Sequence, residues 1–251
     1  MSVSRPVLCL AVAALAVASC GSDDEPIATA TFTSPEANAQ VAGSVELKMA
    51  AEGITIEEAG EARDGAGHFH VIADAGCVST GDGIGKDTDH VHFGKGQTTG
   101  LIYLEPGSHD LCLQVGDGTH RALDITDRRT VEVGITDKDG FCDVVKEIDD
   151  LFEEIDSSSD EFEVKQIGYE SIRRLGVQMA AGLDVVDADS RADVEATAAF
   201  VDAMTSAFVD ASDIGEAEKA LVPVFETMEG GLPGGKWILD NCGVDINEGE
   251  E

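Results

Sequence analysis

The histidines of this 251-residue chain are confined to one stretch, between positions 68 and 120. They are His68, His70, His90, His92, His109 and His120. The first four form two His-x-His pairs, and side chains two residues apart on a strand point to the same face. Phe69 and Val71 then lie on the opposite face, where we expect a core. Because imidazole is a common ligand of zinc and copper, we predict that strands bring these rings together in a metal site.

The predicted site draws on both pairs and on the two later histidines. The ligands are His68, His70, His92, His109 and His120, with His90 as a further candidate. Metal-bound imidazole usually donates its other ring nitrogen to a carboxylate or carbonyl. The residues placed for that supporting role are Asp74, Asp89, Gln97 and Asp110. The ligand type favours copper or zinc as the cofactor.

Two other functions remain open. In one, the histidines are framework residues of a non-catalytic binding or structural module and hydrogen-bond turns and neighbouring strands. In the other, the metal serves a hydrolase, but no acidic residue beside the histidines stands in a recognisable general-base motif. The sequence also has no motif that pairs a nucleophilic serine or cysteine with a base. We therefore expect a protein that is not an enzyme.

Residues 27–136 have the pattern of short strands. Val45, Leu47 and Met49 alternate with charged residues, and similar alternation recurs at 111–115 and 131–135. Turn-forming glycine, proline and aspartate residues separate these runs. Several short strands at such spacing predict an all-β, immunoglobulin-like antiparallel sandwich.

Residues 137–251 have helical periodicity and are expected to form a second, all-α domain. Apolar residues recur at helical spacing in 141–155, 162–182 and 194–208, and further helices are expected after Asp213 and around 237–243. The segment 138–251 holds 29 acidic and 8 basic residues. These carboxylates are expected on the solvated faces of an acidic helical bundle. The net charge of −34 for the whole chain argues against nucleic acid as a partner.

Four motifs in the β region occur in the order of a known family. They are GHFHVIAD at 67–74, HFGKGQT at 92–98, LEPGSHDLCLQ at 104–114 and DGTH at 117–120. Over about residues 64–135 the chain resembles the bacterial family called domain of unknown function 4399. The resemblance implies a small exported β-domain with a common site at His68, His70, His92, His109 and His120. Phe69 stands between two histidines where family members can have a third, and Asp110 replaces the usual threonine.

The first residues have the pattern of an export signal. Arg5, an apolar run and the sequence Val17-Ala18-Ser19-Cys20 resemble a bacterial lipoprotein signal. Residues 1–19 would be removed, Cys20 would carry the lipid, and residues 20–26 would form a tether. We therefore expect a lipoprotein anchored to the membrane at the bacterial cell envelope, with an envelope protein as a partner of the helical domain. Around Cys142 and Cys242, that domain resembles helical appendages of exported proteins of actinobacterial type.

Four cysteines remain beyond the signal and the lipid site. In an exported chain they are expected to form disulfides, and three pairings are open. Pairing Cys77 with Cys112 and Cys142 with Cys242 keeps each bridge inside one domain, so we prefer it.

Overall fold

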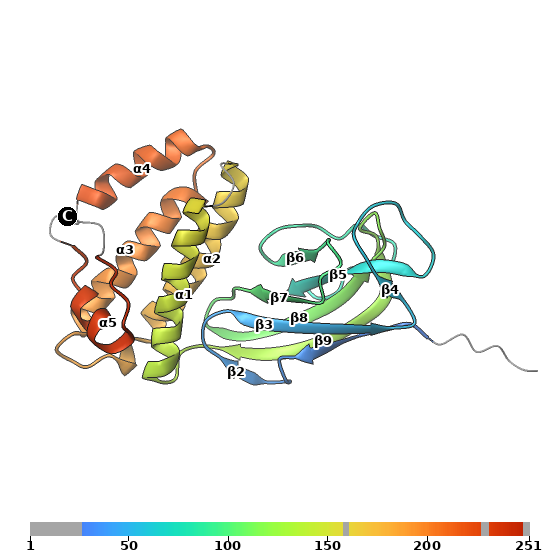
Figure 1. Ribbon diagram of the computed structural model, residues 1–251, viewed down its shortest axis with the longest axis horizontal. Helices are drawn as coiled ribbons and strands as arrows, with labels where there is room; N and C mark the ends of the chain where they lie inside the picture. Colours follow the sequence, from blue (N-terminus) through green and yellow to red (C-terminus); the bar gives the residue numbers. More distant parts are fainter. Residues whose placement is uncertain (1–26, 158–160, 227–230, 248–251) are drawn as a thin grey trace, which may run out of the picture.

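The computed structural model describes residues 27–157, 161–226 and 231–247. They form a β unit followed by a helical unit, and the two units lie end to end (Figure 1). The predicted export signal, Cys20 and the tether lie outside the described residues. None of the described helices is long and apolar enough to cross a membrane.

The strands precede the helices, as the sequence predicts. The strands are β1 (Thr29–Ser34), β2 (Ala39–Val41), β3 (Val45–Glu52), β4 (Thr55–Ile56), β5 (Ala66–Ala73), β6 (His90–Phe93), β7 (Thr99–Ile102), β8 (Gly107–Gly116) and β9 (Ala122–Val133). The helices are α1 (Lys138–Ser157), α2 (Phe162–Ala181), the short 3-10 helix η1 (Leu183–Val185), α3 (Arg191–Val209), α4 (Ile214–Glu226) and α5 (Gly235–Cys242).

Two sheets enclose the core of the β unit. One has the strand order β1-β3-β7 and the other β2-β9-β8-β5-β4, with β6 also paired to β5. The inward residues of β3, Val45, Leu47 and Met49, are buried as their alternation predicts. They belong to the same apolar cluster as Phe69 and Val71 of β5. This shared core occupies one face of β5 and leaves the other face to the histidines.

The larger sheet is mixed, so the prediction of a purely antiparallel architecture was wrong at two short edge strands. β2 pairs in parallel with β9, and β4 pairs in parallel with β5. After pairing antiparallel with β3, the chain leaves β1 at Ser34 and crosses to the other sheet. Alternation of apolar residues identifies a strand and its buried face, but it does not reveal the direction of the neighbouring strand.

The helical unit is closed by a disulfide between its first and last helices. Cys142 of α1 is bonded to Cys242 of α5, and Phe141 packs edge-on against Trp237. One apolar cluster runs through α1, α2, α3, α4 and α5. The second disulfide joins Cys77 to Cys112 in the β unit. Both bonds are the pairs preferred from the sequence.

Polar side chains of α2 join the two units. The buried Gln178 donates to the carbonyl oxygens of Gly43 and Leu104, at 3.1 and 2.9 Å, and accepts from the Gly43 N–H at 2.9 Å. Four residues earlier, Arg174 donates to the Tyr103 carbonyl oxygen at 3.0 Å and pairs with Asp89 of the β unit at 2.9 Å. The two units are therefore held together by hydrogen bonds from side chains of α2 to backbone groups of the β unit. Those backbone groups lose their partners if Gln178 or Arg174 is replaced.

Replacing Gln178 with leucine is expected to uncouple the two units. The change keeps the approximate size of the side chain but leaves three buried backbone groups without partners, at about 1–3 kcal/mol each. The free energy of unfolding should fall by about 3 kcal/mol or more, with the two units melting separately in calorimetry. Gln166→Leu is the matched control, because Gln166 donates to carbonyl oxygens inside the helical unit. If both variants melt in a single transition, Gln178 does not couple the units.

Candidate metal centre

Two neighbouring strands bring three histidines to one face of the larger sheet. His68 and His70 lie on the face of β5 opposite Phe69 and Val71. In the antiparallel register, His92 of β6 stands directly across from His70. The two histidines of each His-x-His pair therefore lie on the same face of their strand, as predicted. The pairing of β5 with β6 then brings His92 next to His70.

His120 reaches the same place from the loop between β8 and β9. Its φ of 65° is in the left-handed region, which non-glycine residues seldom adopt. The preceding turn holds it there. The Asp117 carboxylate accepts from the N–H groups of Thr119 and Arg121, at 2.8 and 3.0 Å, and the Asp117 carbonyl accepts from the His120 N–H at 2.9 Å. A rare backbone conformation that is held in place by several hydrogen bonds is often found at functional sites.

The four rings meet at distances that suit a common ion. Nε2 of His68 lies 2.9 Å from Nε2 of His70 and 3.1 Å from Nδ1 of His120. One ligand atom from each of the four residues, His92 included, lies within 4.8 Å of all the others. Nitrogens bound to one ion at about 2.05 Å are about 2.9 Å apart at a right angle and about 3.3 Å apart at the tetrahedral angle. Two of the separations are therefore already those of ligands to one metal.

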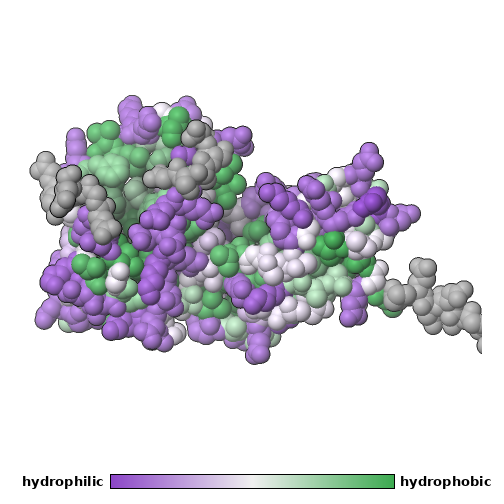
Figure 2. Space-filling view, viewed as in Figure 1, coloured by the Kyte–Doolittle hydropathy of each residue, from purple (hydrophilic) through white to green (hydrophobic). Residues whose placement is uncertain are grey.

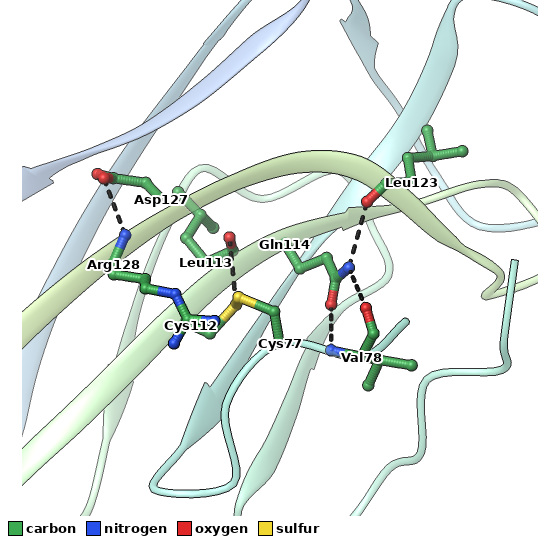
Figure 3. The surroundings of a disulfide bond; sticks show 8 residues. All are labelled: Cys77, Val78, Cys112, Leu113, Gln114, Leu123, Asp127 and Arg128. Atoms are coloured by element: carbon green, nitrogen blue, oxygen red, sulfur yellow. Dashed lines mark hydrogen bonds between the residues drawn. A yellow bond between two sulfur atoms is a disulfide. The ribbon is translucent and has the colours of Figure 1, made fainter. Parts of the chain in front are cut away.

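A disulfide and a glutamine hold the cover of this site. The segment between β5 and β6 folds back over the histidine face of the sheet, and Cys77 in it is bonded to Cys112 of β8. Gln114 of β8 accepts from the Val78 N–H and donates to the Val78 carbonyl oxygen, both at 2.9 Å (Figure 3). Under this cover the side chains of His68 and His70 are buried, with 0% and 1% of their surfaces exposed.

Two glycines leave room for the rings. A Cβ atom at Gly116 would lie 2.9 Å from Nε2 of His70, and one at Gly94 would collide with the ring of His92. Cβ atoms essentially never approach other heavy atoms so closely. Gly94 of the HFGKGQT motif and Gly116 at the end of β8 therefore contribute to the site by lacking a side chain.

Ring nitrogens in the cluster lack hydrogen-bond partners. Among the described residues, His68 Nδ1, His70 Nδ1 and His92 Nε2 are buried without one. Buried polar atoms are normally paired, so unpaired ones call for an explanation. A cation between the rings would bind Nε2 of His68 and of His70, which already face neighbouring rings, and the unpaired Nε2 of His92 is a further donor. The Nδ1 atoms of His68 and His70 are not ligands of that ion, because one imidazole does not bind the same ion through both nitrogens.

Burial and crowding favour the neutral form of these rings. Burial, followed by repulsion from His92 and His120, lowers the pKa of His68 to about 4, and Asp117 opposes the shift. Burial and repulsion from His68 lower the pKa of His70 to about 3. Burial is also the main cause that lowers the pKa of His92. At neutral pH the rings are uncharged and hold the lone pairs that a metal requires.

The metal-free protein is expected to lose stability in mild acid. The pKa values of His68 and His70 lie below the ordinary value of 6.5, so the unfolded state binds more protons as pH falls. The loss begins near pH 6.5 and continues toward pH 4 and 3. It should reach about 5 kcal/mol at pH 4.5 for the two residues together, at about 1.4 kcal/mol per pH unit each. Urea unfolding across this range measures it, and the double variant His68→Gln/His70→Gln should show a much weaker dependence. An unchanged pH dependence in that variant would assign the effect to other groups.

His109 is not part of the cluster, and its prediction as a ligand was wrong. It lies near the start of β8, five residues before Gln114, which pairs with His70. That separation is about 17 Å along a strand. Its Nδ1 is 2.7 Å from the Asp74 carboxylate and its Nε2 is 2.8 Å from the Glu105 carbonyl oxygen. Both nitrogens have partners, so His109 is a framework histidine.

His90 lies at the rim of the site. It precedes His92 by two residues and shares its face of β6, but it is not among the four converging residues. Its Nδ1 is 2.8 Å from Oδ1 of Asp87, in the segment that covers the site. The further candidate from the sequence therefore contacts the cover rather than the other rings.

The four residues predicted to support the ligands have other partners, so that prediction was also wrong. Asp74 contacts His109, Asp89 pairs with Arg174, Gln97 accepts from the Lys95 N–H, and Asp110 accepts from the Thr130 hydroxyl. Their nearness in sequence to a histidine does not place them on its side of the sheet. Asp117, which sequence reasoning missed, shapes the turn that carries His120. The Asp117-Gly118 pair, a turn signal two residues before His120, is the feature of the sequence that identifies Asp117.

Comparison with known proteins finds a family model that matches part of the β unit. Residues 47–135 match the family model described as "Domain of unknown function (DUF4399)", which confirms the resemblance expected from the histidine motifs. No curated protein matches the chain. Among solved structures, the chain is similar to one titled "Structures of Clostridium thermocellum CbhA fibronectin(III)-like modules", with 12% identity and a TM-score of 0.27. That similarity covers 42% of this chain and 96% of the other.

Proposed function

We propose that the β unit binds one transition-metal ion, zinc or copper, through His68, His70, His92 and His120. The observation that carries the proposal is the convergence of four imidazoles from β5, β6 and the turn after β8, with ligand atoms within 4.8 Å of one another. The neutral state of His68 and His70 and their burial beneath a disulfide-held cover favour a tightly held ion over a surface-bound one.

The contrast with His109 favours metal binding over a framework role. A framework histidine pairs its ring nitrogens with carboxylates and carbonyl oxygens, as His109 does with Asp74 and Glu105. In the cluster, His68 and His70 instead face each other nitrogen to nitrogen at 2.9 Å. Two neutral imidazoles gain at most one hydrogen bond from such an approach. A cation shared by the four rings would instead accept a lone pair from each of them.

We further propose that the site is not catalytic. Four protein ligands complete the tetrahedral shell that zinc prefers, whereas catalytic zinc sites keep one position open for water or substrate. The roles that remain are holding, sensing or carrying the ion. A hydrolase would need an open position and a nearby general base.

The fold and location that we propose follow the sequence. The β unit would be an immunoglobulin-like sandwich, and the two disulfides support an oxidising compartment outside the cytoplasm. With Cys20 lipid-modified, the protein would be a membrane-anchored lipoprotein of the cell envelope. The described chain enters β1 at the end of the β unit that lies far from the helices (Figure 1). The helical unit would then lie farthest from the anchor, where it can contact an envelope partner.

Titration of the metal-free protein tests the metal site. Calorimetry with zinc and copper(II), and native mass spectrometry, should each give one ion per chain. Native mass spectrometry should also show the ion lost below about pH 5, because protonated imidazole cannot bind a metal. An absence of saturable binding would leave the framework role as the better explanation.

Fractionation tests the anchor separately. Cys20→Ala should move the protein to the soluble fraction or leave an unprocessed precursor. Normal processing with unchanged membrane association would contradict the lipoprotein assignment without affecting the metal site.

A further inference from the structure

The helical unit contains a cavity of about 530 Å³, and no histidine lines it. It is lined by residues of all five α-helices, among them Ile148, Phe152, Val201, Met204, Leu221 and Phe225. Figure 2 shows apolar side chains gathered in a hollow between α4 and the helices beside it. Protein interiors are normally packed with few voids larger than a water molecule. An apolar cavity of only about 150 Å³ already binds benzene, and ligand pockets span roughly 300–1,000 Å³.

The lining of this cavity is mostly apolar, and two of its polar side chains are already hydrogen-bonded within the chain. The Thr197 hydroxyl already donates to the Asp193 carbonyl oxygen at 3.3 Å and accepts from the Gly234 N–H at 3.1 Å. The side-chain oxygen of Asn247 accepts from the Leu232 N–H at 2.7 Å. Because the chain itself uses these groups, the lining suits hydrocarbon rather than ordered water.

One wall of the cavity is loosely held. In α4 only Ala217 is buried, while Leu221 and Phe225 face the cavity and Phe225 remains 54% exposed. Pro223 lies inside this helix, where its missing N–H removes a backbone hydrogen bond. Met179 and Met204, whose side chains adapt to irregular shapes, line the cavity as well. The wall can therefore adjust to an occupant.

Charge restricts the occupant. Asp149 is exposed and lines the cavity, so a carboxylate stands at its mouth. Residues 138–251 carry 29 acidic against 8 basic side chains, and such a field repels anions. A fatty acid or a phosphate-bearing lipid would bring its negative head group to this mouth.

We propose that the helical unit binds the single apolar chain of an amphiphile whose head group is uncharged or cationic, with the chain in the cavity and the head group near Asp149. This site is independent of the metal centre. It stands whether or not the histidines bind an ion.

Dye binding to the whole protein tests the site. The uncharged dye N-phenyl-1-naphthylamine should bind saturably, one per chain, with a rise in fluorescence. Dodecylamine below its aggregation concentration should displace it at a concentration at least ten times lower than dodecanoate. Asp149→Asn should reduce that preference, whereas Asp150→Asn, which changes an exposed neighbour that does not line the cavity, should not.

Adjacent residues of α4 provide the matched pair of variants. Leu221→Glu places a charge in the cavity wall and should weaken dye binding at least tenfold, because an unpaired charge is costly in apolar surroundings. Val222→Glu adds the same charge to a residue that is 56% exposed and should change the affinity less than twofold. Circular dichroism checks that both variants fold. If Leu221→Glu does not fold, Met204→Trp, which fills part of the cavity, takes its place with an expected fivefold loss.

Four outcomes would overturn the proposal. The first is wild-type protein that shows no saturable dye binding, and the second is an equal loss in Leu221→Glu and Val222→Glu. The third is dodecanoate that competes as well as dodecylamine, which overturns the assignment of the head group. The last is a concentration-dependent dimer in sedimentation that disappears together with dye binding in Leu221→Glu, which would make a second copy of this chain the occupant.

Discussion

Replacing His120 with asparagine is expected to weaken zinc binding about a hundredfold or more. Zinc sites with four protein ligands bind with roughly 10–16 kcal/mol, so one ligand accounts for about 3 kcal/mol, and each 1.4 kcal/mol is a factor of ten. Asparagine is chosen because it tolerates the left-handed backbone that His120 adopts, whereas alanine would add strain. His120 also lies in a turn rather than in the core, so the fold should survive. Competition with a chelator of known affinity measures the change.

His109→Asn is the control for that experiment. His109 lies near the start of β8 and contacts Asp74 and Glu105, outside the cluster. Its replacement should leave zinc affinity within about twofold while lowering stability by about 1 kcal/mol through the lost hydrogen bonds. If the two variants lose zinc affinity equally, the four-histidine site is wrong. The double variant His70→Gln/His92→Gln should abolish binding altogether, since it removes the facing pair on β5 and β6.

The sequence predicted which face of β5 the histidines occupy. It did not predict which of the histidines come together. The period of two in His68-Phe69-His70 placed the rings on one face and Phe69 in the core, which the structure confirms. Of the two later histidines, only His120 joins the cluster, because it lies in the turn after β8 whereas His109 lies near the start of that strand. That position follows from the register, in which His68 pairs with Gly116 at the far end of β8 from His109. Register is a property of two strands, and no pattern within one of them contains it.

The burial of the histidines was beyond sequence reasoning for a similar reason. All eight residues of β5 are buried, although only one face reaches the core between the sheets. The other face is covered by the segment that Cys77 and Gln114 hold down. A covering segment without regular structure has no periodicity to detect. The preferred disulfide Cys77–Cys112 was the one available indication that this segment returns to the sheet.

Removing the disulfide between α1 and α5 is expected to produce the largest loss of stability. The double variant Cys142→Ser/Cys242→Ser opens a loop that spans 100 residues of sequence. Loop-closure entropy assigns such a bridge about 4–5 kcal/mol, comparable to the whole stability of a small domain. The helical unit should therefore melt at a much lower temperature, or fail to fold at 37 °C. Calorimetry and far-ultraviolet circular dichroism measure the change.

The two disulfides should differ in what else they affect. Cys142→Ser/Cys242→Ser leaves the β unit intact, so zinc affinity should stay within about twofold of the wild type if the β unit remains folded. Cys77→Ser/Cys112→Ser opens a shorter loop of 35 residues, and its entropic cost is about 4 kcal/mol in the same treatment. That bridge holds the cover over His68 and His70, so its loss should also weaken zinc binding about tenfold by admitting water and loosening the rings. A bridge that served stability alone would lower the melting temperature and leave the affinity unchanged. Measuring both quantities in both double variants therefore separates a structural disulfide from one that shapes the metal centre.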